Sequence, residues 1–171
     1  MTQHSLEKLF EHNNWANIQI IQACSALSDG QLDTEPQSAT LGSIRSTLFH
    51  LVTSQQGYLR LLTLPLEERL EPVPTPPFAE LQNLASKCGK ALLALSQNES
   101  SISMKGRIQT RDGFLVEPWV ILLQIINHAT EHREQIKSML SALGVTPPEI
   151  DGWTYGEFTK ALIPIGKEDK R

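Results

Sequence analysis

Two histidines four residues apart, His128 and His132, are the side chains best suited to do chemistry in this sequence. They belong to a series of mostly apolar positions from Ile121 to Leu143 that are spaced by three or four residues, as on one face of a helix. At about 100° per residue, the two imidazoles lie about 40° apart and one turn above each other. Burying both rings is costly unless each nitrogen has a partner, and a divalent cation binds one nitrogen of each. The spacing therefore predicts a metal site on the buried face of a helix.

Two histidines do not complete a metal site, and no cysteine lies near them in the sequence. A second helix must therefore supply further ligands. His50 and His12 are both candidates, because each lies on the shoulder of the apolar stripe of its own predicted helix. Periodicity does not choose between them. Three neutral imidazoles leave coordination positions free for water or substrate, as in catalytic rather than structural sites.

The segment from His128 to His132 also has the form H-x-x-E-H, the pattern of inverted zinc proteases in which the glutamate is a general base. Glu131 would lie about 60° from His128, within reach of the open side of an ion. The short stretch of sequence after His132 leaves little room for a further ligand helix and a substrate-binding domain. The pattern therefore indicates a metal site more than a protease, and a solvated carboxylate is the alternative role of Glu131.

Polar residues on buried helix faces are the remaining candidates for a pocket beside the ion. Asn13 and Asn17 lie on the apolar face of the first predicted helix, and Gln55 lies on that of the second. The two asparagines either line a cavity or form hydrogen bonds between helices. Our candidates for the substrate pocket are Asn13, Asn17, Gln55 and Glu131.

The elements that must position these residues are helices. Apolar residues at helical spacing predict long helices over residues 5–26, 43–62, 76–95 and 118–143. Ser43 and Thr75 are expected to cap two of them. The connection over residues 27–42 is polar, and five prolines between Pro65 and Pro77 favour an extended segment.

Two short elements complete the predicted fold. The sequence Arg-Asp-Gly at residues 111–113, between apolar stretches, predicts a short β-hairpin before the fourth long helix. A short helix is expected after Thr154, whose spacing to Glu157 resembles a capping box. The predicted fold class is all-α: a four-helix bundle with long connections, a short β-hairpin before helix 4 and a short C-terminal helix.

Length and composition indicate a single domain and exclude several classes of function. The 171 residues, 40% of them hydrophobic, fit one domain over residues 1–166, followed by a charged tail at 167–171 that we expect to be disordered. The net charge of −4 is opposite to that of a nucleic-acid binder. The absence of a glycine-rich phosphate loop or a paired-carboxylate di-iron pattern disfavours nucleotide and ferritin-like chemistry.

The expected location is the cytoplasm, without a membrane partner. No apolar run is long enough to span a bilayer, and the first residues have neither a basic region nor an apolar signal core. Cys24 and Cys88 occupy apolar positions of predicted helices at no metal-binding spacing. We therefore expect two buried thiols in a reducing compartment.

Three segments resemble those of the DinB family of helical-bundle metalloenzymes, which are related to thiol-dependent transferases and isomerases. They are Asn-Trp-Ala-Asn at 14–17, Leu-Gly-Ser-Ile-Arg-Ser-Thr-Leu-Phe-His at 41–50, and residues 127–136, followed by Leu143-Gly144, Pro147-Pro148 and Asp151. Together they cover most of the chain in the order of the family. The resemblance implies that His50, His128 and His132 bind a metal ion within a homodimer, and it demotes His12.

Two departures from the family pattern bear on the activity. Gln55 stands where many relatives carry a glutamate, which removes an acid or base, and Glu134 stands where many carry glycine. Imidazole ligands suit one divalent ion per chain, zinc or nickel first, with iron and manganese as alternatives. The function we predict is metal-dependent transfer of a low-molecular-weight thiol to an electrophilic small molecule. The alternatives are a metal-dependent hydrolase and a non-catalytic, metal-stabilised protein that acts in stress response or binding.

Overall fold

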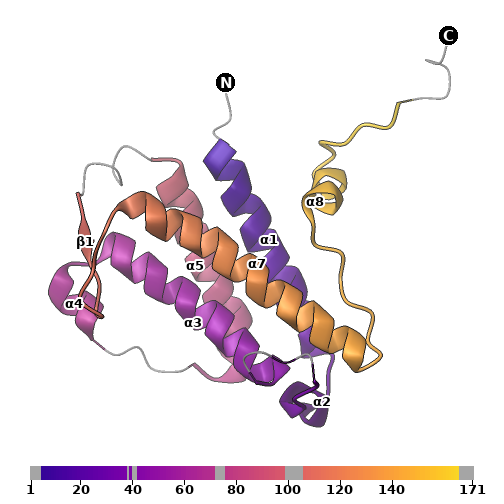
Figure 1. Cartoon of the computed structure of the whole chain (residues 1–171). Helices are drawn as coiled ribbons and strands as arrows, with labels where there is room; N and C mark the ends of the chain where they lie inside the picture. Colours follow the sequence, from indigo (N-terminus) through magenta and orange to yellow (C-terminus); the bar gives the residue numbers. More distant parts are fainter. Residues whose placement is uncertain (1–4, 38, 40–41, 72–75, 99–105, 166–171) are drawn as a thin grey trace.

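Four long helices account for most of the residues described by the computed structural model, which are 5–37, 39, 42–71, 76–98 and 106–165. These helices are α1 (Ser5–Ser25), α3 (Ile44–Thr63), α5 (Leu81–Ser96) and α7 (Pro118–Ala142) (Figure 1). α1 packs against α5 and α7, and α3 packs against the same two helices. α1 and α7 run in one direction, and α3 and α5 run in the other (Figure 1). The predicted all-α fold with a four-helix bundle is confirmed, whereas the predicted tail at 167–171 lies outside the described residues.

The helix ends follow the expected local signals at several points. The side chain of Ser43 caps α3 and accepts a hydrogen bond from the backbone N–H of Ser46. Pro118 occupies the first turn of α7, where its missing N–H is not needed. α7 ends before Gly144, whose φ of 73° is a left-handed conformation that favours glycine. The long helix that carries the two histidines is therefore bounded as the sequence predicts.

The connection between α1 and α3 contains a short helix, α2 (Asp29–Asp33), that the sequence analysis did not predict. Ser28 accepts a hydrogen bond from the backbone N–H of Gln31, and the Gln31 side chain accepts one from the backbone N–H of Ser28. The spacing of Ser28 and Gln31 is that of a capping box, so this helix start could have been predicted from the sequence. Arg45 ties α2 to α3, because its Nε lies 2.6 Å from Asp33 Oδ1 and its Nη2 lies 2.6 Å from Asp29 Oδ1.

The proline-rich connection joins α3 to α5, two neighbouring helices that run in the same direction (Figure 1). It contains a short helix, α4 (Leu66–Leu70), where the sequence predicted an extended segment. The helix after it begins later than predicted, with the 3-10 turn η1 (Phe78–Glu80) that continues into α5. The predicted N-cap, Thr75, lies outside the described residues.

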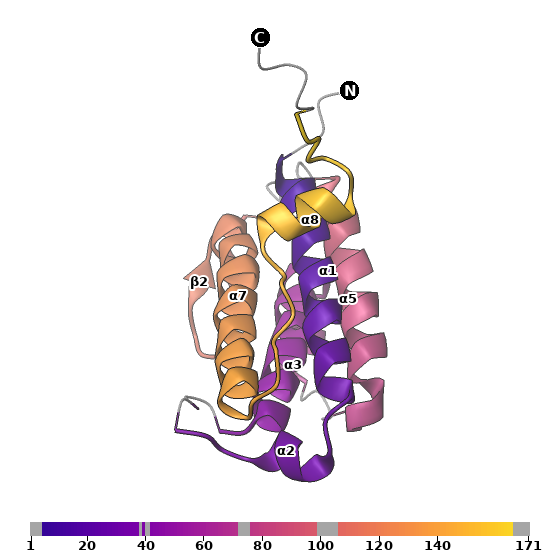
Figure 2. The same ribbon diagram turned by 90° about the vertical axis from the view of Figure 1, so that its right-hand side faces the viewer.

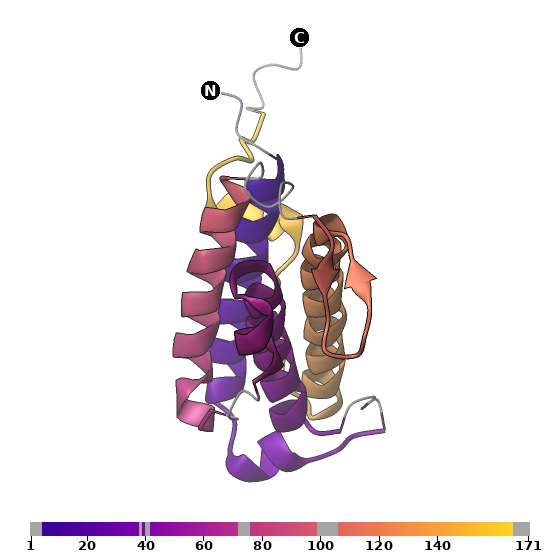
Figure 3. The same ribbon diagram turned by 90° about the vertical axis from the view of Figure 1, so that its left-hand side faces the viewer.

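The predicted hairpin is present as two short strands, β1 (Ile108–Gln109) and β2 (Leu115–Val116), which pair antiparallel with Ile108 opposite Val116. Gly113, in the turn, has a φ of 90°. The hairpin lies beside the first half of α7 (Figure 3). The remainder of the predicted first strand, at 102–105, lies outside the described residues.

The C-terminal helix α8 (Gly152–Phe158) crosses α1 (Figure 2). Its N-cap is Asp151 rather than the predicted Thr154, because the Asp151 carboxylate accepts the backbone N–H of Thr154. The two residues belong to overlapping capping patterns, and the aspartate starts the helix earlier. The rings of Trp15 and Tyr155 join α1 to α8, with centroids 5.2 Å apart.

The apolar core consists of two clusters, one at each end of the bundle. One cluster contains Ile20, Ile44, Leu48, Ile136 and Met139, among others. The other contains Phe10, Leu62, Leu92, Ile121 and Ile125, among others. Buried polar residues of α1, α3 and α7 lie between them along the helices. No helix in the described part of the chain is long and apolar enough to cross a membrane.

Both cysteines should resist modification until the protein unfolds. Cys24 and Cys88 are buried free thiols, as expected. Burial raises the pKa of the Cys24 thiol to about 12 and that of Cys88 to about 11, so the reactive thiolate is scarce at neutral pH. We expect a disulfide reagent such as Ellman's reagent to titrate both thiols in denaturant and neither in native buffer. Rapid reaction of either thiol in the folded protein would contradict this.

Candidate metal centre

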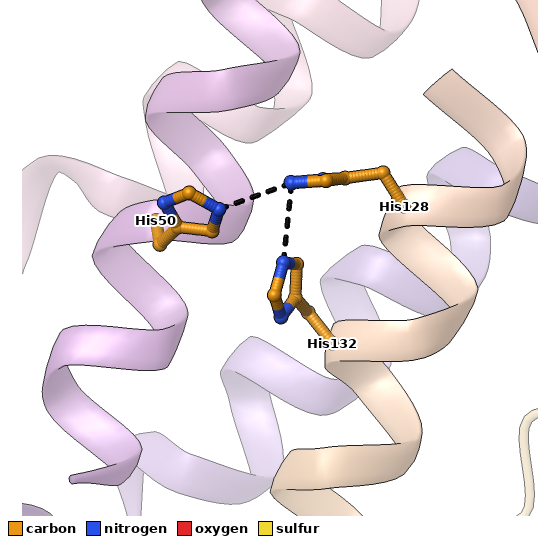
Figure 4. A group of neighbouring side chains, drawn as sticks. All are labelled: His50, His128 and His132. Atoms are coloured by element: carbon orange, nitrogen blue, oxygen red, sulfur yellow. Dashed lines mark hydrogen bonds between the residues drawn. The ribbon is translucent and has the colours of Figure 1, made fainter. Parts of the chain in front are cut away.

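Three imidazoles from two helices meet at one point of the bundle. His50 comes from α3, and His128 and His132 come from α7 (Figure 4). His128 Nε2 lies 3.0 Å from His50 Nε2 and 3.1 Å from His132 Nε2, and one ligand atom of each ring lies within 4.8 Å of the others. Two nitrogens bound to one ion at about 2.0–2.1 Å are about 3–3.5 Å apart, so both separations fit shared coordination. The three histidines could therefore hold a metal ion.

The packing of two helices explains how distant histidines come together. His128 and His132 are one turn apart on α7, as their spacing predicts. α7 packs against α3, which brings His50 opposite them. His12, the other candidate, lies on α1, where its Nε2 is 2.9 Å from the carbonyl oxygen of Ile150. The helix pairing thus places His50 in the cluster and His12 outside it.

A second layer of contacts orients the ring of His132. Its Nδ1 lies 2.8 Å from Oε1 of Gln135, one turn further along α7. An amide oxygen can only accept, so Nδ1 carries the proton and Nε2 of the neutral ring directs a lone pair at the cluster. Gln135 was visible in the sequence only as a polar residue at the edge of the helix face.

The surroundings of His50 and His128 favour the neutral imidazole, which is the form that binds metal. Burial, followed by the charges of His132 and His50, lowers the pKa of His128 to about 4. Burial, followed by His132, also lowers the pKa of His50. Both rings therefore retain a free lone pair at neutral pH, and protons compete weakly for the site.

The metal-free protein should lose stability as the pH falls from about 6.5 to about 4. In this interval His128 of the unfolded chain takes up a proton that the folded chain excludes. The free energy of unfolding is therefore highest above about pH 6.5 and decreases progressively until the pH reaches about 4, where the folded chain also takes up the proton. The measurement is urea unfolding across this range in the presence of a chelator. His128→Gln is the matched variant, and the difference in stability between wild type and variant should change with pH. A difference that stays constant from pH 7 to pH 4 contradicts the assignment.

A buried network of hydrogen bonds surrounds Arg133, the residue that follows His132 on α7. Arg133 is only 3% exposed, and its Nη1 donates to Oδ1 of Asn13 at 2.7 Å and to Oδ1 of Asn17 at 2.6 Å. Its Nη2 donates to the Thr130 hydroxyl at 2.9 Å. Asn17 Nδ2 in turn donates to Oε1 of Gln55 at 2.6 Å. Burial lowers the pKa of Arg133 to about 10, and the charge of Glu134 opposes this.

The predicted pocket residues fall into two groups. Asn13, Asn17 and Gln55 are fully buried and bind one another or Arg133, which is the interhelical role considered for the asparagines. Within the described residues, Asn13 Nδ2 and Gln55 Nε2 have no hydrogen-bond partner. Glu131 is exposed on α7, and the metal-ligand group found among the described residues does not include it. A role of these residues in a substrate pocket stays a prediction.

A cavity of about 420 Å³ lies next to the cluster. Its lining includes Ser54, one turn after His50, and Gln124, one turn before His128. It also includes Tyr58, whose ring meets that of His128 edge to face, with centroids 5.6 Å apart. The sequence analysis missed this cavity, because its walls come from α3, α4, the hairpin and α7 together.

The fold and the cluster define a class of protein, a four-helix bundle whose facing helices present three histidines able to bind a metal ion. The chain belongs to the DinB family, because residues 1–169 match the model of that family. It is similar to Protein DinB of Bacillus subtilis (strain 168), with 27% identity over 163 residues that cover 90% of this chain and 94% of the relative. The resemblance seen in the sequence motifs is confirmed.

Proposed function

We propose that the three histidines bind one divalent ion and that the protein transfers a low-molecular-weight thiol to an electrophilic carbon. The observation that carries this proposal is a group of three imidazoles, two of them only partly buried, beside a cavity of about 420 Å³. Such a site leaves access for a small molecule, unlike a structural site closed by four protein ligands. Zinc and nickel are the ions that the donor set suits best, with iron and manganese next.

The roles of the chain follow from its contacts. When a divalent ion is bound, it supplies a positive charge that lowers the pKa of a thiol at the site. His50, His128 and His132 hold the ion, and Gln135 orients the ring of His132. The cavity beside Tyr58 holds the substrate near the histidines. The thiol sulfur then bonds to the electrophilic carbon, the leaving group departs with its electron pair, and the thiol proton passes to solvent.

Glu131 is exposed and outside the ligand group of the described residues, which weighs against a hydrolase that uses it as a base. The amide of Gln55 cannot act as a base at neutral pH, and its oxygen accepts a hydrogen bond from Asn17. These two observations keep a non-catalytic metal-binding protein as the second candidate. The two functions differ in one respect, which is turnover of a thiol.

The experiment is a transfer assay with zinc-loaded protein, cysteine or glutathione, and 1-chloro-2,4-dinitrobenzene. Formation of the coloured thioether, with release of chloride, should exceed the rate of the metal-free protein and of His128→Ala. The absence of any excess rate with every thiol would reject transfer and favour the non-catalytic function, provided that metal analysis shows a loaded site.

We also propose that the protein acts as a homodimer in the cytoplasm. Support comes from large apolar side chains exposed on the hairpin and on the start of α7, which are Phe114, Leu115, Trp119 and Leu123, each at least 52% exposed. We expect sedimentation to give twice the chain mass of 19.1 kDa for the wild type and a smaller value for Trp119→Glu. A wild-type mass equal to that of one chain at high concentration contradicts the dimer.

A further inference from the structure

Three arginines gather in the cavity beside the histidine cluster. Arg60 comes from α3, Arg69 from α4 and Arg111 from the turn of the hairpin. Among the described residues, none of the three forms an ion pair with a carboxylate. The chain as a whole is acidic, with a net charge of −4, so this group of arginines is opposite in sign to the overall charge.

The contacts of two of these arginines fix their positions without neutralising them. Arg60 Nη2 donates to the backbone carbonyls of Glu68 and Glu71. Arg69 Nη1 donates to the carbonyl of Gln109 at 3.2 Å, which joins α4 to β1. Carbonyl oxygens orient a guanidinium group and leave its charge in place. Arg111 is exposed and has no hydrogen bond within the described part of the chain.

The cavity also contains two carboxylates, Glu71 and Asp112, so that the arginines exceed them by one charge. Guanidinium groups bind carboxylate and phosphate oxygens in paired, charge-assisted hydrogen bonds. A volume of about 420 Å³ lies in the range of sites for small molecules. The lining therefore suits a compact ligand with an anionic group.

The arginines form part of the cavity lining, and the histidines lie beside the cavity without forming part of that lining. Three residues of the cavity lining are close to the histidines. Ser54 lies one helical turn after His50, Gln124 lies one turn before His128, and the ring of Tyr58 contacts that of His128. Arg60 follows two residues after Tyr58 on α3. A small molecule in this cavity can therefore contact an arginine at one end and lie beside the residues that flank the histidines at the other.

We propose that this cavity binds a small molecule with a carboxylate or phosphate group, which the arginines hold, and with its thiol directed at the histidine cluster. The anionic part of this proposal is independent of catalysis, and the placement of the thiol rests on the proposed function. The substrate is thus an anionic thiol, and neutral thiols are poor ligands.

The experiment is calorimetric titration of the zinc-loaded protein with four probes: succinate, inorganic phosphate, mercaptosuccinate and the uncharged thiol 1-thioglycerol. Succinate or phosphate should bind, and the stronger of the two identifies the anionic group. Mercaptosuccinate should bind more tightly than succinate and at least about tenfold more tightly than 1-thioglycerol. If neither succinate nor phosphate binds, the anion site is rejected. If succinate binds and mercaptosuccinate binds no better, the anion site stands and the proposed thiol function fails.

Charge variants of exposed residues separate this site from general electrostatics. Arg111→Gln should weaken succinate binding about tenfold. Asp112→Asn keeps a turn-forming sequence, removes an opposing charge and should strengthen binding. Arg107→Gln is the matched control, because Arg107 lies beside the same hairpin but outside the cavity and pairs with Glu117 at 2.9 Å. Equal weakening by Arg107→Gln and Arg111→Gln, or weakening by Asp112→Asn, would overturn the proposal.

Discussion

Replacing His128 by alanine should remove most of the metal from the purified protein. His128 Nε2 is the atom that faces both other rings, at 3.0 Å from His50 Nε2 and 3.1 Å from His132 Nε2. Its loss leaves two imidazoles on separate helices, and affinity should fall by more than the about 10–100-fold typical of losing an outer contact. The measurement is elemental analysis of protein purified without an affinity tag, in parallel with the wild type.

Two further variants define what the result means. His12→Ala removes a histidine from the same bundle but outside the cluster, and the metal content should stay at the wild-type level. Gln135→Ala removes only the acceptor of His132 Nδ1 and should weaken metal binding by about tenfold. Equal metal content in the wild type and in His128→Ala would defeat the assignment of the site.

Replacing Arg133 by methionine should lower the free energy of unfolding by about 2–6 kcal/mol. Methionine has a similar length but donates no hydrogen bond, so the buried oxygens of Asn13 and Asn17 lose the donor that now satisfies them. Each such buried acceptor without a partner costs about 1–3 kcal/mol. Urea unfolding of the metal-free protein measures the effect without a contribution from metal binding.

Matched controls test whether the loss of stability in Arg133→Met comes from the broken hydrogen-bond network or from the loss of a positive charge. Arg107→Met removes an exposed arginine and should change stability by less than about 1 kcal/mol. Asn13→Asp replaces the unpaired Nδ2 of Asn13 with an oxygen, makes the group that accepts from the guanidinium negatively charged, and should preserve or raise stability at neutral pH. That benefit should vanish when acid protonates the new carboxylate. A loss below about 1 kcal/mol for Arg133→Met contradicts the structural role of the network.

Features that depend on neighbours along one helix were predictable from the sequence. The apolar stripe that contains His128 and His132 fixed their common face, and Pro118 and Gly144 marked the bounds of their helix. Ser43 likewise marked the start of α3. Each of these signals is a local relation between side chain and backbone, and no tertiary contact overrides it.

Features that depend on the pairing of helices were beyond the sequence pattern. His50 and His12 have equivalent positions on their own helices, and only the packing of α3 against α7 distinguishes them. Arg133 follows a ligand and was not among the candidate residues, yet it is buried because two asparagines of α1 supply acceptors for its guanidinium. A hydrogen-bond partner that is distant in the sequence does not alter the spacing of apolar residues, because it changes only the environment of the buried residue. Such a partner is therefore not predictable from periodicity.

The separation of the histidines along the chain has a consequence for folding. His50 and His128 are 78 residues apart, so an ion bound by both closes a long loop of the polypeptide, as a covalent staple would. Binding to the native state alone adds stability in proportion to the logarithm of the free ion concentration. The concentration of free metal ion would then determine the thermal stability of the protein, and a chelator would lower its melting temperature.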